Sequence, residues 1–108
     1  MSKVNGQIVR DENNVPAGWN FLNITLAAPT TTAVKTTSGM LHTITFNKPI
    51  ATGVVTIYDS LAASGTVIAT ITVPASPMPV TLTYDLAFTI GLTIVTATAA
   101  QDITVTYI

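Results

Sequence analysis

From residue 31 to the end of the chain, polar and apolar residues alternate. The segments HTITF, ATITV, VTLTY and DITVTY all repeat with a period of two, which is the spacing of a strand with one buried and one exposed face. Most polar positions are threonines, and 21 of the 108 residues are of this type. Threonine favours strands through its β-branched side chain and adds no charge. The pattern predicts a compact all-β domain.

Turn formers separate the alternating segments at the spacing typical of a sandwich or barrel. Ser38-Gly39 suits a tight turn, and the three prolines of PASPMP enforce an extended crossover. We therefore predict an antiparallel β-sandwich of about seven or eight strands, with jelly-roll or immunoglobulin-like topology. The expected strands lie near 31–37, 40–47, 53–59, 66–73, 79–84, 86–90, 92–97 and 102–107.

The alternation also assigns most strand residues to a face. The expected core residues are Ile44, Phe46, Val55, Ile57, Val67, Ala69, Ile71, Val73, Val80, Leu82, Tyr84, Leu92, Ile94, Ile103, Val105 and Tyr107. On the opposite faces, a few apolar residues interrupt the rows of threonine. Gathered on one face, they would form a patch suited to contact between copies of the chain. These candidate self-interface residues are Val54, Ile68, Val95, Ala97 and Ile108.

Residues 1–30 differ from the rest, and we expect an extended N-terminal arm there, followed by a β-sandwich domain over residues 31–108. The segment VPAGWNFLNITL holds an apolar cluster that we expect to anchor the arm on another protein or on a neighbouring subunit. The members of this cluster are Val15, Trp19, Phe21 and Leu22. In the alternative interpretation, the segment is the first strand and its tryptophan closes one end of the core. Both interpretations hold if the arm packs on a neighbouring subunit.

The chain carries little charge. Charged residues make up 8% of it, against about 25% in typical soluble proteins, and its net charge is -1. Strands with so few charged residues are prone to edge-to-edge association. We therefore expect a homo-oligomer whose subunits cover one another's surfaces. The alternative is that the hydroxyl and amide side chains hydrate the surface well enough.

Composition argues against several classes of function. Four basic residues cannot follow a phosphate backbone, so no nucleic-acid partner is expected. No apolar run approaches the roughly 20 residues of a membrane-spanning helix, and the first residues lack the apolar region of a secretory signal. Cysteine is absent, which excludes disulfides and thiolate metal sites. We expect no membrane partner.

We expect no enzymatic activity, no cofactor and no metal, because no catalytic or ligand constellation is recognisable. His42 is the only histidine, and it shares a face of its predicted strand with Phe46. We interpret it as a structural or interface residue. Asp59, Asp85 and Asp102 each begin or end a predicted strand, where bonding within the local turn is the ordinary role of aspartate.

Carbohydrate binding is the main alternative to a structural role, because many sandwich domains present aromatic rings to sugars. Trp19, Phe21 and Tyr58 are the only candidates for exposed rings. The polar side chains that would orient sugar hydroxyls are mostly short Thr and Ser.

Three segments resemble a small β domain of tailed-bacteriophage virion proteins: SGMLHTITFNKP, GVVTIYDSLAASGTVIATITVPA and VTLTYDLAFTIGLTIVTATAAQDITVTYI. The resemblance covers residues 38–108. Ile90 departs from it, because a polar turn residue is expected there. The matching residues are Gly39, Leu41, His42, Tyr58, Asp59, Gly65, Tyr84, Asp85, Phe88, Gly91, Leu92 and Asp102.

The resemblance implies a capsid-decorating or head-fibre role, as a symmetric trimer with its N-terminal arm toward the capsid shell. We therefore expect a structural protein of the virion, made in the host bacterial cytoplasm, that binds the major capsid protein or another virion protein. Deletion of residues 1–22 is expected to abolish attachment while the β region still folds. The alternative function is a glycan- or receptor-binding module of a phage fibre.

Overall fold

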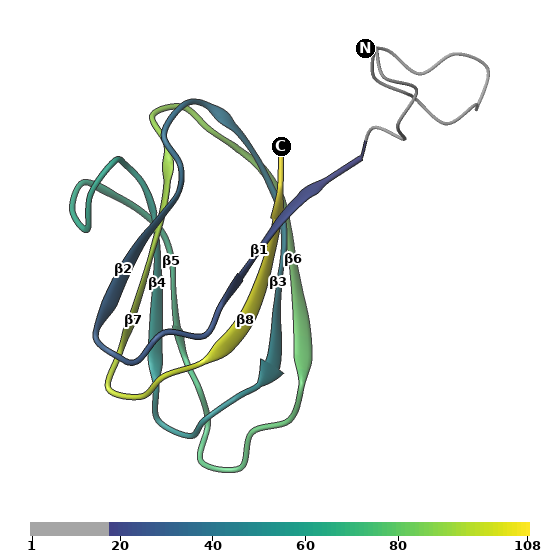
Figure 1. The fold of residues 1–108 in the computed structure, drawn as a ribbon, viewed down its shortest axis with the longest axis vertical. Helices are drawn as coiled ribbons and strands as arrows, with labels where there is room; N and C mark the ends of the chain where they lie inside the picture. The colour runs from purple at the N-terminus through teal and green to yellow at the C-terminus, as the bar shows by residue number, and fades with distance from the viewer. Residues whose placement is uncertain (1–17) are drawn as a thin grey trace.

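The computed structural model describes residues 18–108, which form eight strands in two facing sheets (Figure 1). One sheet has the strand order β1-β8-β3-β6 and the other has the order β2-β7-β4-β5. The predicted all-β sandwich is confirmed. The strands are β1 (Asn20–Ile24), β2 (Thr30–Lys35), β3 (Gly39–Lys48), β4 (Val54–Asp59), β5 (Thr66–Thr72), β6 (Val80–Phe88), β7 (Leu92–Ala97) and β8 (Asp102–Tyr107).

The strand pairing follows a simple rule. β1 pairs with β8, β2 with β7, β3 with β6 and β4 with β5, always antiparallel. The chain is therefore one long hairpin, whose tip is the loop 60–65, and the hairpin is folded over into two sheets. This is the jelly-roll arrangement, and its strand order differs from that of the immunoglobulin fold. Of the two predicted topologies, the structure has the jelly roll.

The core lies between the inner faces of the two sheets, and both sheets contribute to it. Its largest side chains are Phe46 and Phe88, which are 2% and 1% exposed. Away from the bulges, alternation along each strand delivers these residues to one face, as the pleat requires. The buried apolar residues are Ile24, Leu41, Ile44, Phe46, Val55, Ile57, Val73, Phe88, Leu92, Ile94, Ile103 and Val105.

β1 lies within the segment expected to be an arm. It pairs with β8 in a regular register that places Leu22 opposite Val105, and Ile24 is buried at 3% exposure. For residues 20–24, the first strand of the alternative interpretation is observed. Its tryptophan does not close the core, because Trp19 is 41% exposed and stacks on His42. The predictions for residues 1–17, Val15 among them, concern residues outside the described part of the chain.

A bulge in β5 reverses two predicted side-chain directions. Ala69 pairs with Ile57 and Val67 pairs with Tyr58, so Ile68 is an extra residue between the two pairs. As a result Val67, expected in the core, is 50% exposed, while Ile68 packs against the core. One unpaired residue shifts the alternation by one position, which exchanges the two faces.

A second irregularity joins two predicted strands into one. Residues 79–84 and 86–90 were expected to be separate, whereas β6 runs without a break from Val80 to Phe88. Asp85, the residue taken as a turn, has a left-handed φ of 48° and sits at a register shift against β3. Aspartate tolerates this conformation better than most residues, so a bulge replaces the expected turn.

Candidate functional site

The outer face of the β2-β7-β4-β5 sheet carries no charged side chain in the described part of the chain. Its two central strands place Val54 beside Ala97, and Thr56 beside Val95. We call this surface the charge-free face, and its residues are Thr31, Ala33, Val54, Thr56, Tyr58, Val67, Thr70, Thr72, Val95 and Ala97. Thr93 points to the same side of the sheet but is buried, at 1% exposure. Covering this face with another protein would desolvate hydroxyl and methyl groups but no ionic charge.

The predicted self-interface residues do not all lie on one surface. Val54, Val95 and Ala97 are neighbours on the charge-free face. Ile68 packs against the core because of the bulge in β5. Ile108 exchanges two backbone hydrogen bonds with Met40 of β3, so it belongs to the other sheet. The five residues therefore give one cluster of three, and Ile68 and Ile108 lie apart from it.

The outer face of the β1-β8-β3-β6 sheet is different, because it holds aspartates, amides and aromatic rings. We call it the polar face. Its residues are Phe21, Asn23, His42, Thr43, Thr45, Asn47, Thr81, Thr83, Asp85, Asp102, Thr104 and Thr106, together with Trp19 just before β1. Hydroxyl pairs cross the strands of this face, Thr43 with Thr106 at 2.6 Å and Thr45 with Thr81 at 2.9 Å.

A ladder of amides and one carboxylate crosses three strands of the polar face. The Asn23 amide of β1 donates to Asp102 Oδ1 of β8 at 2.8 Å, and the Asn47 amide of β3 donates to the same oxygen at 3.1 Å. Asn47 also donates to Thr104 at 3.0 Å. The hydrogen bonds from Asn23 and Asn47 lower the pKa of Asp102, and the charge of Lys48 acts in the same direction. Asp102 is therefore held as an anion by both neighbouring strands.

Trp19, His42 and Asp85 form a second cluster on this face. The indole of Trp19 stacks on the His42 ring with centroids 4.2 Å apart and planes 13° from parallel. The His42 ring is also held by a hydrogen bond between its Nδ1 atom and the Asp85 carboxylate. The three residues come from the start of β1, from β3 and from β6, so the cluster links both edges of the sheet.

A bulge explains why His42 points outward, although it was expected to share a face with Phe46. The register shifts between Leu41 and Thr43, against both neighbouring strands. Leu41 and Ile44 are both fully buried, which strict alternation forbids. His42 is thus turned from the core side to the polar face, where the left-handed Asp85 meets it.

The predicted anchoring residues have different environments. Leu22 points inward and packs against the core, so its own domain already occupies it. Trp19 is 41% exposed and Phe21 is 73% exposed. Trp19, Phe21 and Asn23 alternate with inward residues and therefore lie in a row on the same side of β1. Among the described members of this cluster, Trp19 and Phe21 are the two exposed to contact with another molecule.

Asp59 holds a loop far away in the sequence. Its carboxylate accepts hydrogen bonds from the backbone N–H groups of Thr89 at 2.9 Å, Ile90 at 2.8 Å and Gly91 at 3.3 Å. These bonds, those from Thr89 and Ile90 above all, lower the pKa of Asp59. Ile90, which departs from the virion pattern, is 54% exposed in this loop.

Sequence reasoning missed these roles of the aspartates. Local turn bonding was expected for all three, but Asp59, Asp85 and Asp102 bond to residues at least 30 positions away. For Asp102, the signal that could have found its role is the pair of amide side chains near strand ends, Asn23 and Asn47. The partners of Asp59 and Asp85 are backbone N–H groups and a histidine, which no local pattern marks. Their partners depend on strand order, which the sequence left open.

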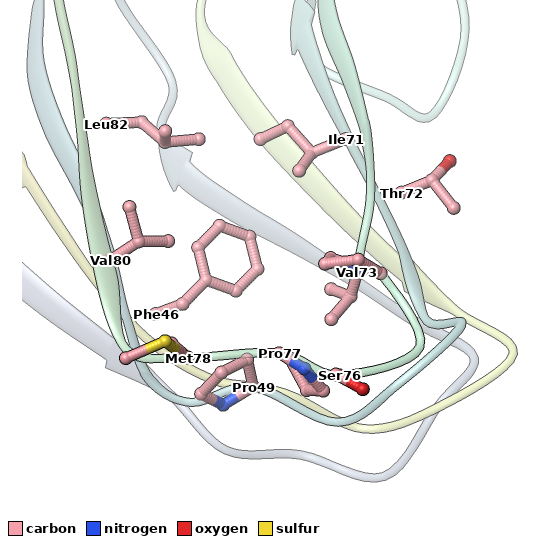
Figure 2. A pocket seen from close by; sticks show the side chains of 11 residues that line it. Phe46, Pro49, Ile71, Thr72, Val73, Ser76, Pro77, Met78, Val80 and Leu82 are labelled. Carbon is pink, nitrogen blue, oxygen red and sulfur yellow. The ribbon is translucent and has the colours of Figure 1, made fainter.

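An apolar pocket opens at the end of the sandwich away from Trp19, between the edge strands β5 and β6 (Figure 2). Its volume is 380 Å³. Figure 2 shows Ile71 and Leu82 on opposite walls, with Phe46 between them and the proline-rich crossover below. Met78 and Val80 at its rim are 76% and 47% exposed.

Comparison of the chain with family models, curated proteins and solved structures gave no match. Within residues 18–108, no group of three or more His, Cys, Asp or Glu side chains is placed to hold a metal ion. The same residues contain no helix with the length and apolar character needed to cross a membrane.

Proposed function

We propose that this chain is a structural protein of a tailed-phage virion, which decorates or cements the capsid as a homotrimer and is anchored through its N-terminal segment. The charge-free face is the observation that carries the proposal. A surface of Thr, Val, Ala and Tyr can be buried against sister subunits at low electrostatic cost, whereas buried unpaired charges cost several kcal/mol each.

The resemblance of residues 38–108 to phage virion domains supports the same function. Several of the matching residues have structural roles that a recurring domain would need. Asp59 holds the loop before β7, and Gly91 in that loop leaves no room for a side chain, since a Cβ there would lie 2.9 Å from the Lys35 carbonyl oxygen. Leu41, Phe88 and Leu92 are buried in the core.

The assembly is tested by light scattering on the purified full chain and on two matched variants. Thr56→Lys places a charge in the middle of the charge-free face, and Thr83→Lys places the same charge on the polar face. The wild type and Thr83→Lys are expected to scatter as trimers, and Thr56→Lys as monomers. A monomeric wild type, or equal dissociation of both variants, contradicts the proposal.

The anchor is tested with phage heads that lack the protein. Because residues 20–24 form β1, deletion of residues 1–22 would remove three of the five residues of this strand, and deletion of residues 1–17 is the cleaner experiment. The shortened chain is expected to keep its trimeric mass and to lose attachment to heads. Attachment equal to that of the full chain would exclude the N-terminal segment as the anchor.

A further inference from the structure

We propose that the polar face binds a neutral saccharide, with Trp19 and Phe21 as the stacking surface and with the Asn23–Asp102–Asn47 ladder as the polar set that orients the hydroxyls. This function goes beyond the structural role proposed above. It would give a virion surface protein a second activity, the retention of particles on neutral glycans.

The stacking surface is rigid. One face of the Trp19 indole lies on His42, which is itself held by Asp85, so the exposed part of the indole is the opposite face and the ring edge. Sugars pack their C–H faces on such rings. A ring that is already fixed in its binding orientation loses little conformational entropy when a ligand arrives.

Phe21 extends the stacking surface along β1. It lies two residues beyond Trp19 on the same side of the strand, which places the two side chains about 6.7 Å apart along the strand. At 73% exposure it is among the most exposed large apolar residues of the described chain. Asn23 follows at the same interval, so two rings lead directly to the ladder.

The ladder offers oriented acceptors. The Nδ2 atoms of Asn23 and Asn47 both point at Asp102 Oδ1, so the amide oxygens of the two residues are turned away from the carboxylate. Acceptors of this kind suit sugar hydroxyls, and they are held in place by bonds between strands. A few fixed polar groups beside an apolar surface are the usual composition of a small-molecule site.

The charges of the face select the type of saccharide. Asp85 and Asp102 place two carboxyl groups on this face, and Lys48 is the only lysine or arginine in the four strands of this sheet. Acidic sugars and nucleic acids are therefore repelled. The occupant that fits is a neutral oligosaccharide.

Trp19 is the only tryptophan of the chain, so its fluorescence reports directly on this site. The full chain is titrated with neutral oligosaccharides of glucose, mannose, galactose and xylose, and with oligogalacturonate as an acidic probe. A saturable change in emission is expected with at least one neutral sugar, together with binding of the acidic probe that is at least tenfold weaker. No change with any neutral sugar would overturn the proposal.

Two variants and a matched control locate the binding. Phe21→Ala and Asn47→Ala are each expected to weaken binding at least fivefold and to keep the trimeric mass. Met78→Ala is the control, because Met78 is as exposed as Phe21 but lies beside the Phe46–Val80 pair, at the end of the sheet away from the Asn20–Tyr107 pair, and it is expected to bind like the wild type. Equal affinity of Phe21→Ala and wild type would place the sugar elsewhere and overturn the assignment.

Head attachment separates this inference from the proposed function. Asn47→Ala is expected to attach to phage heads as the wild type does, because Asn47 lies outside the predicted anchoring cluster. If Asn47→Ala loses attachment and the wild type binds no sugar, the polar face belongs to the capsid contact and the saccharide site does not exist. If sugar binding is observed and head attachment is absent in every variant, the saccharide site stands without the virion role.

Discussion

The two outer faces of this jelly roll have the same threonine-rich background and differ in everything added to it. The charge-free face adds only Val, Ala and Tyr, whereas the polar face adds two aspartates, two asparagines, a histidine and two aromatic rings. The inner faces of the two sheets are alike, since both are apolar. The two sheets therefore differ in their outer faces and not in the residues that they contribute to the core.

The difference indicates which surface can be covered and which can recognise a ligand. Burial of the charge-free face removes no ion from water. On the polar face the Asp102 carboxylate already accepts two amide donors and the Asp85 carboxylate bonds to His42. Groups satisfied in this way are expensive to rearrange, and they keep their directions when a ligand arrives.

The largest expected effect comes from comparing the two sides of one sheet. Phe46→Ala removes a buried ring and is expected to cost about 3–5 kcal/mol of unfolding free energy, because a cavity remains between the sheets. Phe21→Ala removes an equal ring from the polar face and is expected to change it by less than about 0.5 kcal/mol. Urea unfolding of both variants measures the contrast, and a comparable loss in Phe21→Ala would show that its ring supports the fold.

A smaller effect is expected at the bulge of the polar face. Asp85→Ala places alanine at a φ of 48° and removes the hydrogen bond to His42. The left-handed conformation alone is expected to lower the unfolding free energy by about 1 kcal/mol, because alanine is strained there. Asp85→Gly removes the same bond but tolerates that φ. Glycine is therefore expected to be the more stable of the two in urea unfolding, and the reverse order would refute the backbone explanation.

Acid is expected to act on the polar face and on the loop of Asp59. The pKa values of Asp59 and Asp102 are lowered from 3.8 in the folded state. Their contribution to stability is therefore present above the ordinary pKa and is lost as the pH falls through the lowered values. Urea unfolding at pH values from about 5 to about 2 measures the loss, and Asp102→Asn should reduce the slope, since it removes one of the two titrating groups.

The smallest effect is expected on the charge-free face, where the oligomeric state should not depend on the salt concentration. No ion pair can form across a face without charges, so the contact contains no charge interaction that salt could weaken by screening. The mass from light scattering should stay constant between about 0.05 and 1 M sodium chloride. Dissociation at high salt would assign the contact to charged residues elsewhere.

Sequence patterning located most of the strands, but it divided β6 in two, placed β1 in an arm and failed at the bulges. Ile44, Phe46, Val55 and Ile57 are in the core as alternation requires. Ile68 and His42 have the opposite direction to the predicted one, because each lies at a bulge. No local pattern marks an unpaired residue, since its position depends on the strand beside it.

The candidate site was predictable only in its parts. Trp19 and Phe21 could be recognised as candidates for exposed rings, and the small number of charged residues could be counted from the sequence. The ladder could not be foreseen, because Asn23 and Asp102 are 79 residues apart and meet only when the first strand pairs with the last.

Alternation along the chain thus determined the strands, their apolar sides and the low charge of the surface, since the pleat turns successive side chains in opposite directions whatever the neighbours are. Strand order and register decided which outward residues stand together. They depend on contacts between distant segments, and those contacts separated a charge-free surface from a polar one on the same small body.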